Sequence, residues 1–205
     1  MKEKKCRQRE EPLVGPAIET SEPKWRSVAV CLGFLVLALA VRLFCAGHPE
    51  LWGDEALSMW TARQPWMALL KPDTDFPPLH FLMVKASVLL FGSESEWVVR
   101  LPGILFGSMA VAIQVFFGRL LFRSLRVGVL SALFLALSLS HIHFSRDAHS
   151  YGVYLGLSAL SFYLLSRILY AETRTWTTWV AYGFFTSLLC FTHFMGLLVC
   201  ATQGI

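Results

Sequence analysis

Long apolar runs alternate with short polar segments along this chain of 205 residues. A helix that crosses a membrane needs about 20 predominantly apolar residues, and a helix satisfies its own backbone hydrogen bonds in lipid. The runs therefore predict helical membrane spans rather than strands. Five spans are expected at 27–44, 98–122, 127–144, 151–170 and 176–191, and a sixth, cut off by the chain end, at 195–205.

One apolar run, 78–91, is too short to cross the membrane and contains two polar residues, His80 and Lys85. It fits an interfacial helix within an outer segment, 45–97. The positive-inside rule supports this choice, because it puts the following arginines on the cytoplasmic side with the basic tail. These arginines are Arg119, Arg123, Arg126, Arg167 and Arg174. The outer segment then holds most of the acids, which are Glu50, Asp54, Glu55, Asp73, Asp75, Glu94 and Glu96.

The composition agrees with an all-α polytopic membrane protein. Hydrophobic residues make up 55% of the chain and charged residues only 16%, whereas soluble domains carry about 25% charged residues. The polar segment 1–26 is expected to be a disordered cytoplasmic tail. No small-residue cleavage site follows the first apolar run, so this run should be a retained anchor. Because the last run stops at Ile205, we expect the N-terminal part of a longer protein.

The first polar site on the expected outer face is the sequence from Leu51 to Ala56, which contains Asp54 and Glu55. The structural interpretation is that Asp54 caps an amphipathic helix over 54–70. Tryptophans at positions 52, 60 and 66 would then anchor that helix in the interface. The functional interpretation is that the two carboxylates carry chemistry, since perturbed carboxylates occur in both kinds of role.

The second site, 144–151, contains Arg146, Asp147 and His149 between two expected spans. Charged and imidazole groups at a membrane boundary are costly unless they pair with one another or face a wet cavity. A polar hairpin is the structural alternative. A zinc site from this histidine with His141 and His143 is disfavoured, because helix positions i and i+2 point to different faces.

The third site precedes the short apolar run. Asp73 and Asp75 form a D-x-D pair of a kind that can hold a divalent cation, with a solvated loop as the alternative. Pro77 and Pro78 predict an extended turn that opens the interfacial helix.

The order of these motifs resembles the bacterial branch of the GT-C glycosyltransferases, which includes the protein O-mannosyltransferases and the aminoarabinose transferase of lipid A. The motifs are LWGDEA, then FPPLHFLMVKASVLLFG with RLPGILFG, then HFSRDAHSYG and THF, and they cover about 42–205. The resemblance implies a GT-C-like helical bundle with interfacial helices in the first outer loop. It also implies inverting sugar transfer from a polyprenyl-phosphate carrier on the outer face.

The resemblance assigns roles to individual residues. Asp54 matches the candidate base that activates the acceptor hydroxyl, with Glu55 beside it, and Asp147 matches the acid of the second outer loop. Two positions depart from the family pattern. Phe76 stands where relatives often have His or Asn, and 146–149 reads Arg-Asp-Ala-His where they often have Gln-Glu-Ala-Arg.

The expected chemistry requires a carboxylate to take the proton of a hydroxyl, which is a poor nucleophile when neutral. The leaving lipid phosphate requires cationic or hydrogen-bonding groups. The sequence does not require a metal, although a divalent cation could serve the phosphate. The expected substrate-binding residues are Arg146, His149, Tyr151, His80 and His193, with Lys85 as a weaker candidate.

We expect the partners to be a lipid-linked sugar donor, membrane lipid and an acceptor of undefined class, and not nucleic acid. The expected location is a bacterial inner membrane, with the active face periplasmic. One alternative is a transporter or flippase-like protein, which should carry ionisable or helix-breaking residues near the bilayer midplane. Another is an inactive fragment of a glycosyltransferase.

The topology can be tested by cysteine labelling in a background without the native cysteines. A cysteine at Ser93 should react with a membrane-impermeant thiol reagent added outside, and a cysteine at Ser124 should not. The reverse pattern would mean that 78–91 crosses the membrane.

Overall fold

A computed structural model describes residues 23–44, 46–48, 50–71, 77–171 and 175–204. This part of the chain forms ten helices and no strand, which confirms the all-α class. Residues 1–22 of the expected tail lie outside it. The helices are α1 (Lys24–Leu43), α2 (Gly53–Arg63), α3 (Trp66–Leu69), α4 (Leu79–Phe91), α5 (Glu96–Phe122), α6 (Leu125–Leu137), α7 (Leu139–Arg146), α8 (Tyr151–Tyr170), α9 (Trp176–Cys190) and α10 (Gly196–Gln203).

Three helices are long and apolar enough to cross a membrane, which makes this an integral membrane protein of the polytopic kind. They are α1, α5 and α8, and the bent pair α6–α7 raises the number to four if it forms one span. Helix α9 has 15 residues and therefore extends about 22 Å, less than the roughly 30 Å hydrocarbon core. The expected crossings at 176–191 and 195–205 stay predictions.

The span expected at 127–144 is not one straight helix, because the helix breaks at Ser138; the crossing itself stays a prediction. The axes of α6 and α7 differ by 62°. Ser138 has extended backbone angles, φ −64° and ψ 113°, and its hydroxyl accepts a hydrogen bond from the backbone N–H of His141. Serine competes for backbone groups in this way and is a preferred residue at a helix start.

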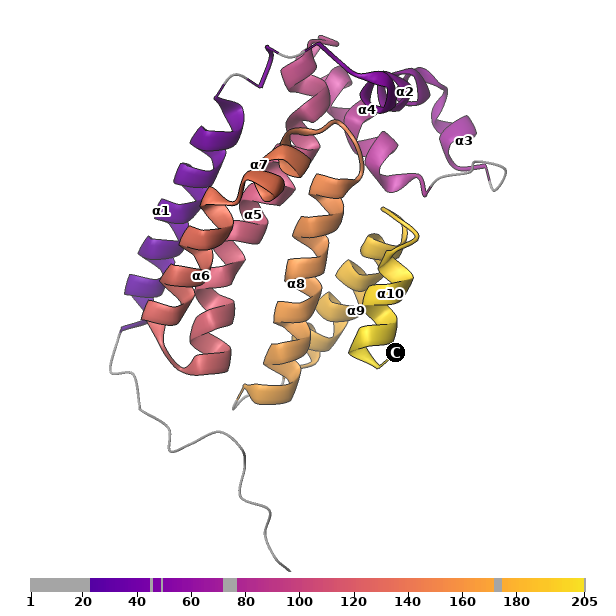
Figure 1. Cartoon of the computed structure of the whole chain (residues 1–205). Coiled ribbons are helices and arrows are strands. Elements are labelled where there is room, and N and C mark those ends of the chain that lie inside the picture. The colour runs from indigo at the N-terminus through magenta and orange to yellow at the C-terminus, as the bar shows by residue number, and fades with distance from the viewer. Residues whose placement is uncertain (1–22, 45, 49, 72–76, 172–174, 205) are drawn as a thin grey trace, which may run out of the picture.

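Helices α2, α3 and α4 lie together at one end of the bundle, with the turn between α7 and α8 (Figure 1). We call this the site end. The expected single helix over 54–70 is wrong in two respects. Its N-cap is Trp52 rather than Asp54, and α2 ends at Arg63 because Pro65, which follows, lacks a backbone N–H to continue the ladder.

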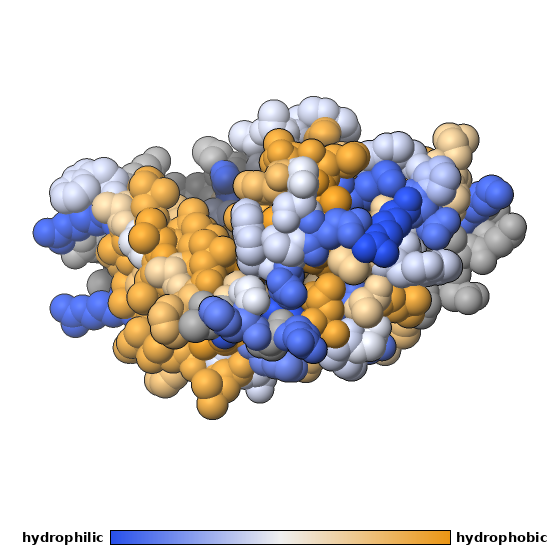
Figure 2. Space-filling view, turned by 90° about the horizontal axis from the view of Figure 1, so that it is seen from above, coloured by the Kyte–Doolittle hydropathy of each residue, from blue (hydrophilic) through white to orange (hydrophobic). Residues whose placement is uncertain are grey.

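Helix α4 agrees closely with the short helix expected at 78–91. It has 13 residues and packs against both α2 and α5. It ends at Gly92, whose φ of 59° lies in the left-handed region that glycine adopts without strain. Seen from the site end, polar side chains gather in the middle of the molecule and apolar side chains flank them (Figure 2).

Helices α5 and α8 approach each other closely at glycines. On α8 these are Gly152 and Gly156, and on α5 it is Gly103, whereas Gly107 lies against Ser145 of α7. A Cβ atom added to Gly152 would lie 2.6 Å from the Cα atom of Gly103. Small residues at a helix contact let helix backbones pack directly in membranes. This contact fixes the start of α8, and therefore the turn that leads into it.

Arg42 lies near the end of α1, where a long side chain can reach the membrane interface, but its side chain turns inward. Its side chain is fully buried. The guanidinium donates to Nδ1 of His141 at 2.8 Å and to the carbonyl of Ala38 at 3.2 Å. A buried polar group needs such partners, so Arg42 fastens α1 to α7 instead of reaching water.

Replacing Gly152 by alanine should destabilise the protein, because the new Cβ atom would meet the backbone of Gly103. Overpacking of this kind costs about 1–3 kcal/mol, visible as a lower thermal unfolding midpoint in detergent. Gly183→Ala is the matched control, since a Cβ atom there meets nothing within 4 Å. Equal midpoints for the two variants would refute the close α5–α8 contact.

Candidate active site

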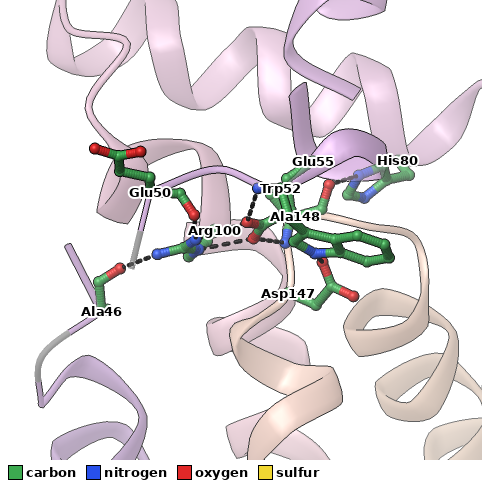
Figure 3. A network of polar contacts seen from close by, with 8 residues as sticks. All are labelled: Ala46, Glu50, Trp52, Glu55, His80, Arg100, Asp147 and Ala148. Carbon is green, nitrogen blue, oxygen red and sulfur yellow. Dashed lines mark hydrogen bonds and ion pairs between the residues drawn. The ribbon is translucent and has the colours of Figure 1, made fainter. Parts of the chain in front are cut away.

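The site end is built around the buried carboxylate of Glu55, which accepts hydrogen bonds from three segments (Figure 3). Arg100 on α5 donates from Nε at 2.7 Å and from Nη2 at 2.6 Å. The backbone N–H of Ala148, between α7 and α8, donates at 2.8 Å. The backbone N–H of Trp52 donates at 3.3 Å, as in the second half of a capping box. Glu55 therefore joins both loops of the site end to the bundle.

Arg100 extends the same network to the link between α1 and α2. Its Nη1 donates to the carbonyl of Ala46 at 2.7 Å, and its Nη2 lies 3.4 Å from the carbonyl of Glu50. A planar guanidinium can serve a carboxylate and carbonyls at once because its N–H groups are fixed in a fork. Arg100 thus satisfies polar groups that this link would otherwise bury unpaired.

Both members of the pair are almost completely removed from water, with side chains 4% exposed for Arg100 and 2% for Glu55. Burial alone would raise the pKa of Glu55. The hydrogen bonds and charge of Arg100, together with the N–H groups of Ala148 and Trp52, outweigh burial and hold the pKa below its usual range. Glu55 is therefore ionised and neutralised, so it is a poor proton acceptor.

Asp54 and Glu55 are neighbours in the first turn of α2 but differ in their surroundings. Asp54 is exposed, whereas Glu55 is buried. Acidic residues in the first turn are favoured by the helix dipole in either case. The two carboxylates of the D-E pair therefore have separate environments, one fastened inside the protein and one open to solvent.

Asp147 is the second buried carboxylate of the site, 5% exposed. The indole Nε1–H of Trp52 donates to its Oδ1 at 3.2 Å. Burial is the largest influence and raises the pKa of Asp147. The nearby negative charge of Glu55 raises it further, while the indole hydrogen bond, His149 and His143 act in the opposite direction.

A cavity of about 370 Å³ opens beside these acids. It lies between the link from α1 to α2, the start of α5 and helix α7. Pockets of roughly this size hold small molecules or parts of them. Its lining residues are Glu50, Trp52, Glu55, Arg100, Leu139, Ile142, His143, Arg146 and Asp147. Two expected site acids and the expected Arg146 thus meet there, and Asp54 is not among the lining residues.

The other expected binding residues gather around a much smaller pocket nearby. His80 and His149 lie 6.2 Å apart between ring centroids, His149 and Tyr151 4.8 Å, and Tyr151 and His193 5.8 Å. All except Tyr151 line the pocket, together with Pro77, Phe81, Ser150, Thr192 and Phe194. The four expected side chains therefore form one imidazole and tyrosine cluster.

His80 is neutral under ordinary conditions. Burial is the main cause that lowers its pKa to about 4; the hydrogen bond with Ala148 raises it and the charge of His149 lowers it again. Its Nε2 lies 3.1 Å from the carbonyl oxygen of Ala148, which only accepts, so Nε2 carries the hydrogen. Its other nitrogen, Nδ1, can therefore only accept a hydrogen bond, and His80 brings no charge to a phosphate at neutral pH.

Lys85, the weaker phosphate candidate, lies apart from both pockets that contain histidines. Its ammonium donates to the carbonyls of Ala62 and Gln64, at 3.1 and 2.8 Å, where α2 ends. It also lies 5.2 Å from the ring centroid of Trp66. These contacts give Lys85 a structural role at the end of the helix.

The described residues contain no group of three or more His, Cys, Asp or Glu side chains that could hold a metal ion. His141 faces Arg42 and Ser145, whereas His143 lines the larger cavity. The D-x-D pair, Asp73 and Asp75, and the family departure at Phe76 lie outside the described residues.

Sequence reasoning missed Arg100 and the indole of Trp52 as parts of the site. The available signal for Arg100 was an arginine at the start of an apolar run, on the face expected to be rich in acids. A charge in that position requires a partner. The indole contact joins residues 95 positions apart, so no local pattern predicts it.

The family model for dolichyl-phosphate-mannose-protein mannosyltransferases matches residues 75–202, more than half of the chain. The chain belongs to this family. At the level of the mannosyltransferase family it is a glycosyltransferase with a lipid-phosphate-linked mannose donor. The match covers α4 to α10, and therefore Arg100 and Asp147, but begins after the D-E pair. No curated protein and no solved structure matches the chain.

Replacing Arg100 by glutamine should strongly destabilise this mannosyltransferase-family chain, because Glu55 would stay buried without its counter-charge. Breaking a buried pair in this way costs about 3–5 kcal/mol. Denaturant unfolding in mixed micelles would measure the loss. Arg63→Gln is the matched control, because the Arg63–Glu94 pair is 53% and 42% exposed and exposed pairs contribute little.

The pH dependence gives a second readout. In the native protein the lowered pKa of Glu55 provides stability above the unfolded-state pKa, and this stability is lost as the pH falls through the folded-state pKa. Without Arg100, burial would instead raise the pKa of Glu55. Acidification should then recover part of the lost stability of Arg100→Gln. A variant that loses further stability on mild acidification would contradict this account.

Proposed function

We propose that the protein transfers mannose from a polyprenyl-phosphate carrier to an acceptor hydroxyl, with inversion at the anomeric carbon, on the non-cytoplasmic side of a bacterial inner membrane. The observation that carries this proposal is the bond network of Glu55, which reaches both outer loops. It gathers Asp54, Glu55 and Asp147 at the same end of the bundle as the histidine cluster.

Asp54 is the proposed catalytic base, and Glu55 the anchor that presents it. Glu55 is neutralised by Arg100 and accepts hydrogen bonds at both oxygens, so its proton affinity is low. Asp54 is the adjacent carboxylate of the same turn and is exposed, so an acceptor can reach it. Fixing Glu55 also fixes the first turn of α2, which restricts where the Asp54 side chain can go.

The proposed reaction is a single displacement. The carboxylate of Asp54 takes the proton of the acceptor hydroxyl as its oxygen forms a bond to C1 of the sugar. The bond between C1 and the phosphate oxygen breaks, and the electron pair leaves with the polyprenyl phosphate. Attack from the face opposite the leaving phosphate inverts the configuration at C1.

Asp147 is proposed to bind a substrate hydroxyl within the larger cavity. Its buried carboxylate lines this cavity with His143 and Arg146, and Oδ1 already accepts the indole hydrogen bond of Trp52. Burial raises the pKa of Asp147, which brings its proton affinity closer to neutral pH. Asp147 is therefore the alternative base if Asp54 does not serve.

The leaving phosphate is proposed to meet the donors of the cluster, His149, Tyr151 and His193, with Arg146, which lines the larger cavity, as the cation. Donors fixed before the reaction can stabilise charge as it develops on the phosphate oxygens. The site end also borders the apolar flanks of the bundle (Figure 2). A carrier whose tail stays in lipid could therefore bring its phosphate to this cluster without leaving the membrane.

The orientation in the membrane is supported by the basic residues at the opposite end of the bundle. Arg119 lies in the last turn of α5 and Arg123 follows it. Arg126 lies in the first turn of α6, and Arg167 in the last turn of α8. An excess of arginine marks the cytoplasmic side, so the site end is proposed to face outward, with the N-terminus inside.

Asp54→Asn in the full-length protein should reduce mannose transfer about 100-fold or more, the usual range for loss of a general base. Membranes incubated with radiolabelled dolichyl-phosphate-mannose give the measurement, as label that moves into products other than the donor. Insertion should be unchanged, checked by the labelling of a cysteine at Ser93.

Two further variants complete this test. Glu94→Gln is the control, because Glu94 is an exposed acid on the same face that pairs with Arg63. Asp147→Asn distinguishes the two candidate bases. Activity that survives Asp54→Asn but is lost in Asp147→Asn would move the role of base to Asp147. Activity retained in both would overturn the proposed mechanism.

A further inference from the structure

Trp52 makes two hydrogen bonds that link Glu55 to Asp147. Its backbone N–H donates to Oε2 of Glu55 at 3.3 Å, and its indole Nε1–H donates to Oδ1 of Asp147 at 3.2 Å. The two bonds reach different outer loops from one residue. An interfacial anchor needs only to place its ring at the membrane boundary, so that role does not explain the contact with Asp147.

The neighbours of Trp52 are themselves fixed. Glu55 is fastened by Arg100 and by the N–H of Ala148, and Ala148 is the residue after Asp147. The backbones of Trp52 and Asp147 are thus both held through the same carboxylate. The indole hydrogen bond adds a direct side-chain contact between Trp52 and Asp147, as Figure 3 shows.

The indole occupies only one oxygen of Asp147. Within the described residues, Oδ2 makes no hydrogen bond, and it is not among the fully enclosed polar atoms that lack a partner. Trp52 and Asp147 both line the larger cavity. One oxygen of the carboxylate is therefore fixed by the protein, and the other is accessible.

We propose that Trp52 is a positioning residue for Asp147: its indole N–H holds Oδ1 and leaves Oδ2 to accept a hydrogen bond from a substrate hydroxyl. This rests on the proposed function for the substrate contact, but the indole contact can be tested without it. The indole suits this task because it only donates. It cannot take the proton of the carboxyl group or exchange roles with it.

The indole bond should also tune the proton affinity of Asp147, since a donor favours the charged form of a carboxylate. Several other groups act on the same carboxylate. Burial and the charge of Glu55 raise the pKa, whereas His149 and His143 lower it. The remaining charged groups of the cavity are Glu50, Arg100 and Arg146. Among these influences, only the indole bond is removed by changing Trp52 to phenylalanine.

The test is a pH titration of the Asp147 carboxyl by infrared spectroscopy on the protein in lipid nanodiscs. The band of protonated Asp147 is identified by its loss in Asp147→Asn. In Trp52→Phe the midpoint of this band should rise by about one pH unit, because a hydrogen bond to a charged group is worth that much or more. Trp60→Phe is the matched control, since Trp60 lies on α2, the helix that Trp52 caps, is 59% exposed and makes no hydrogen bond to Asp147 among the described residues. Its midpoint should equal that of the native protein.

A second measurement keeps the test decisive if Trp52→Phe does not fold. In NMR spectra of the native protein, the chemical shift of one indole N–H should change with pH at the same midpoint as the infrared band of Asp147. This pH dependence should vanish in Asp147→Asn. A midpoint in Trp52→Phe equal to that in Trp60→Phe, or no indole resonance that follows Asp147, would overturn the proposal. Retained mannose transfer in Asp147→Asn would instead reject the substrate contact alone, whatever the midpoint of the band.

Discussion

A carboxylate and a guanidinium that are both removed from water must satisfy each other, and in this protein Glu55 and Arg100 do so where three segments meet. The cost of burying each charge is several kcal/mol unless the pair is well formed and fully hydrogen-bonded. Here backbone groups on either side form hydrogen bonds with the remaining donors and acceptors of the pair. The pair therefore defines where the two loops of the site end can lie, because each loop supplies a group that the pair needs.

The scaffold below the pair works by close packing rather than by charge. Glycines on α5 and α8 bring the two backbones together, and the start of α8 follows directly from the turn that carries Ala148. Helix–helix association in lipid depends on such contact, because apolar burial gives little gain between helices. The packed helices and the ion pair thus act on the same turn from two sides. The site geometry depends on both of them.

The sequence predicted the helices well where the length and hydrophobicity of a run determine them. It predicted the structure poorly where the contacts of a single polar side chain determine it. The long apolar runs predicted α1, α5 and α8, and the short run predicted α4. The break at Ser138 escaped prediction because a serine inside an apolar run is usually tolerated. The burial of Arg42 depends on His141, 99 positions away. Within the D-E pair, sequence order could not reveal which acid turns inward, since that depends on Arg100 in another helix.

The peptide groups on either side of the Ala148 Cα atom face two different pockets. The N–H of Ala148 donates to Glu55 beside the larger cavity, and its carbonyl accepts from His80 beside the histidine cluster. Rotation of this short backbone segment would break one buried bond as it adjusted the other. A movement of this turn would therefore shift polar groups at both pockets together. Natural substitutions in this turn should therefore occur mainly together with substitutions at both pockets. A single substitution in the turn should be selected against even where the altered side chain touches no substrate.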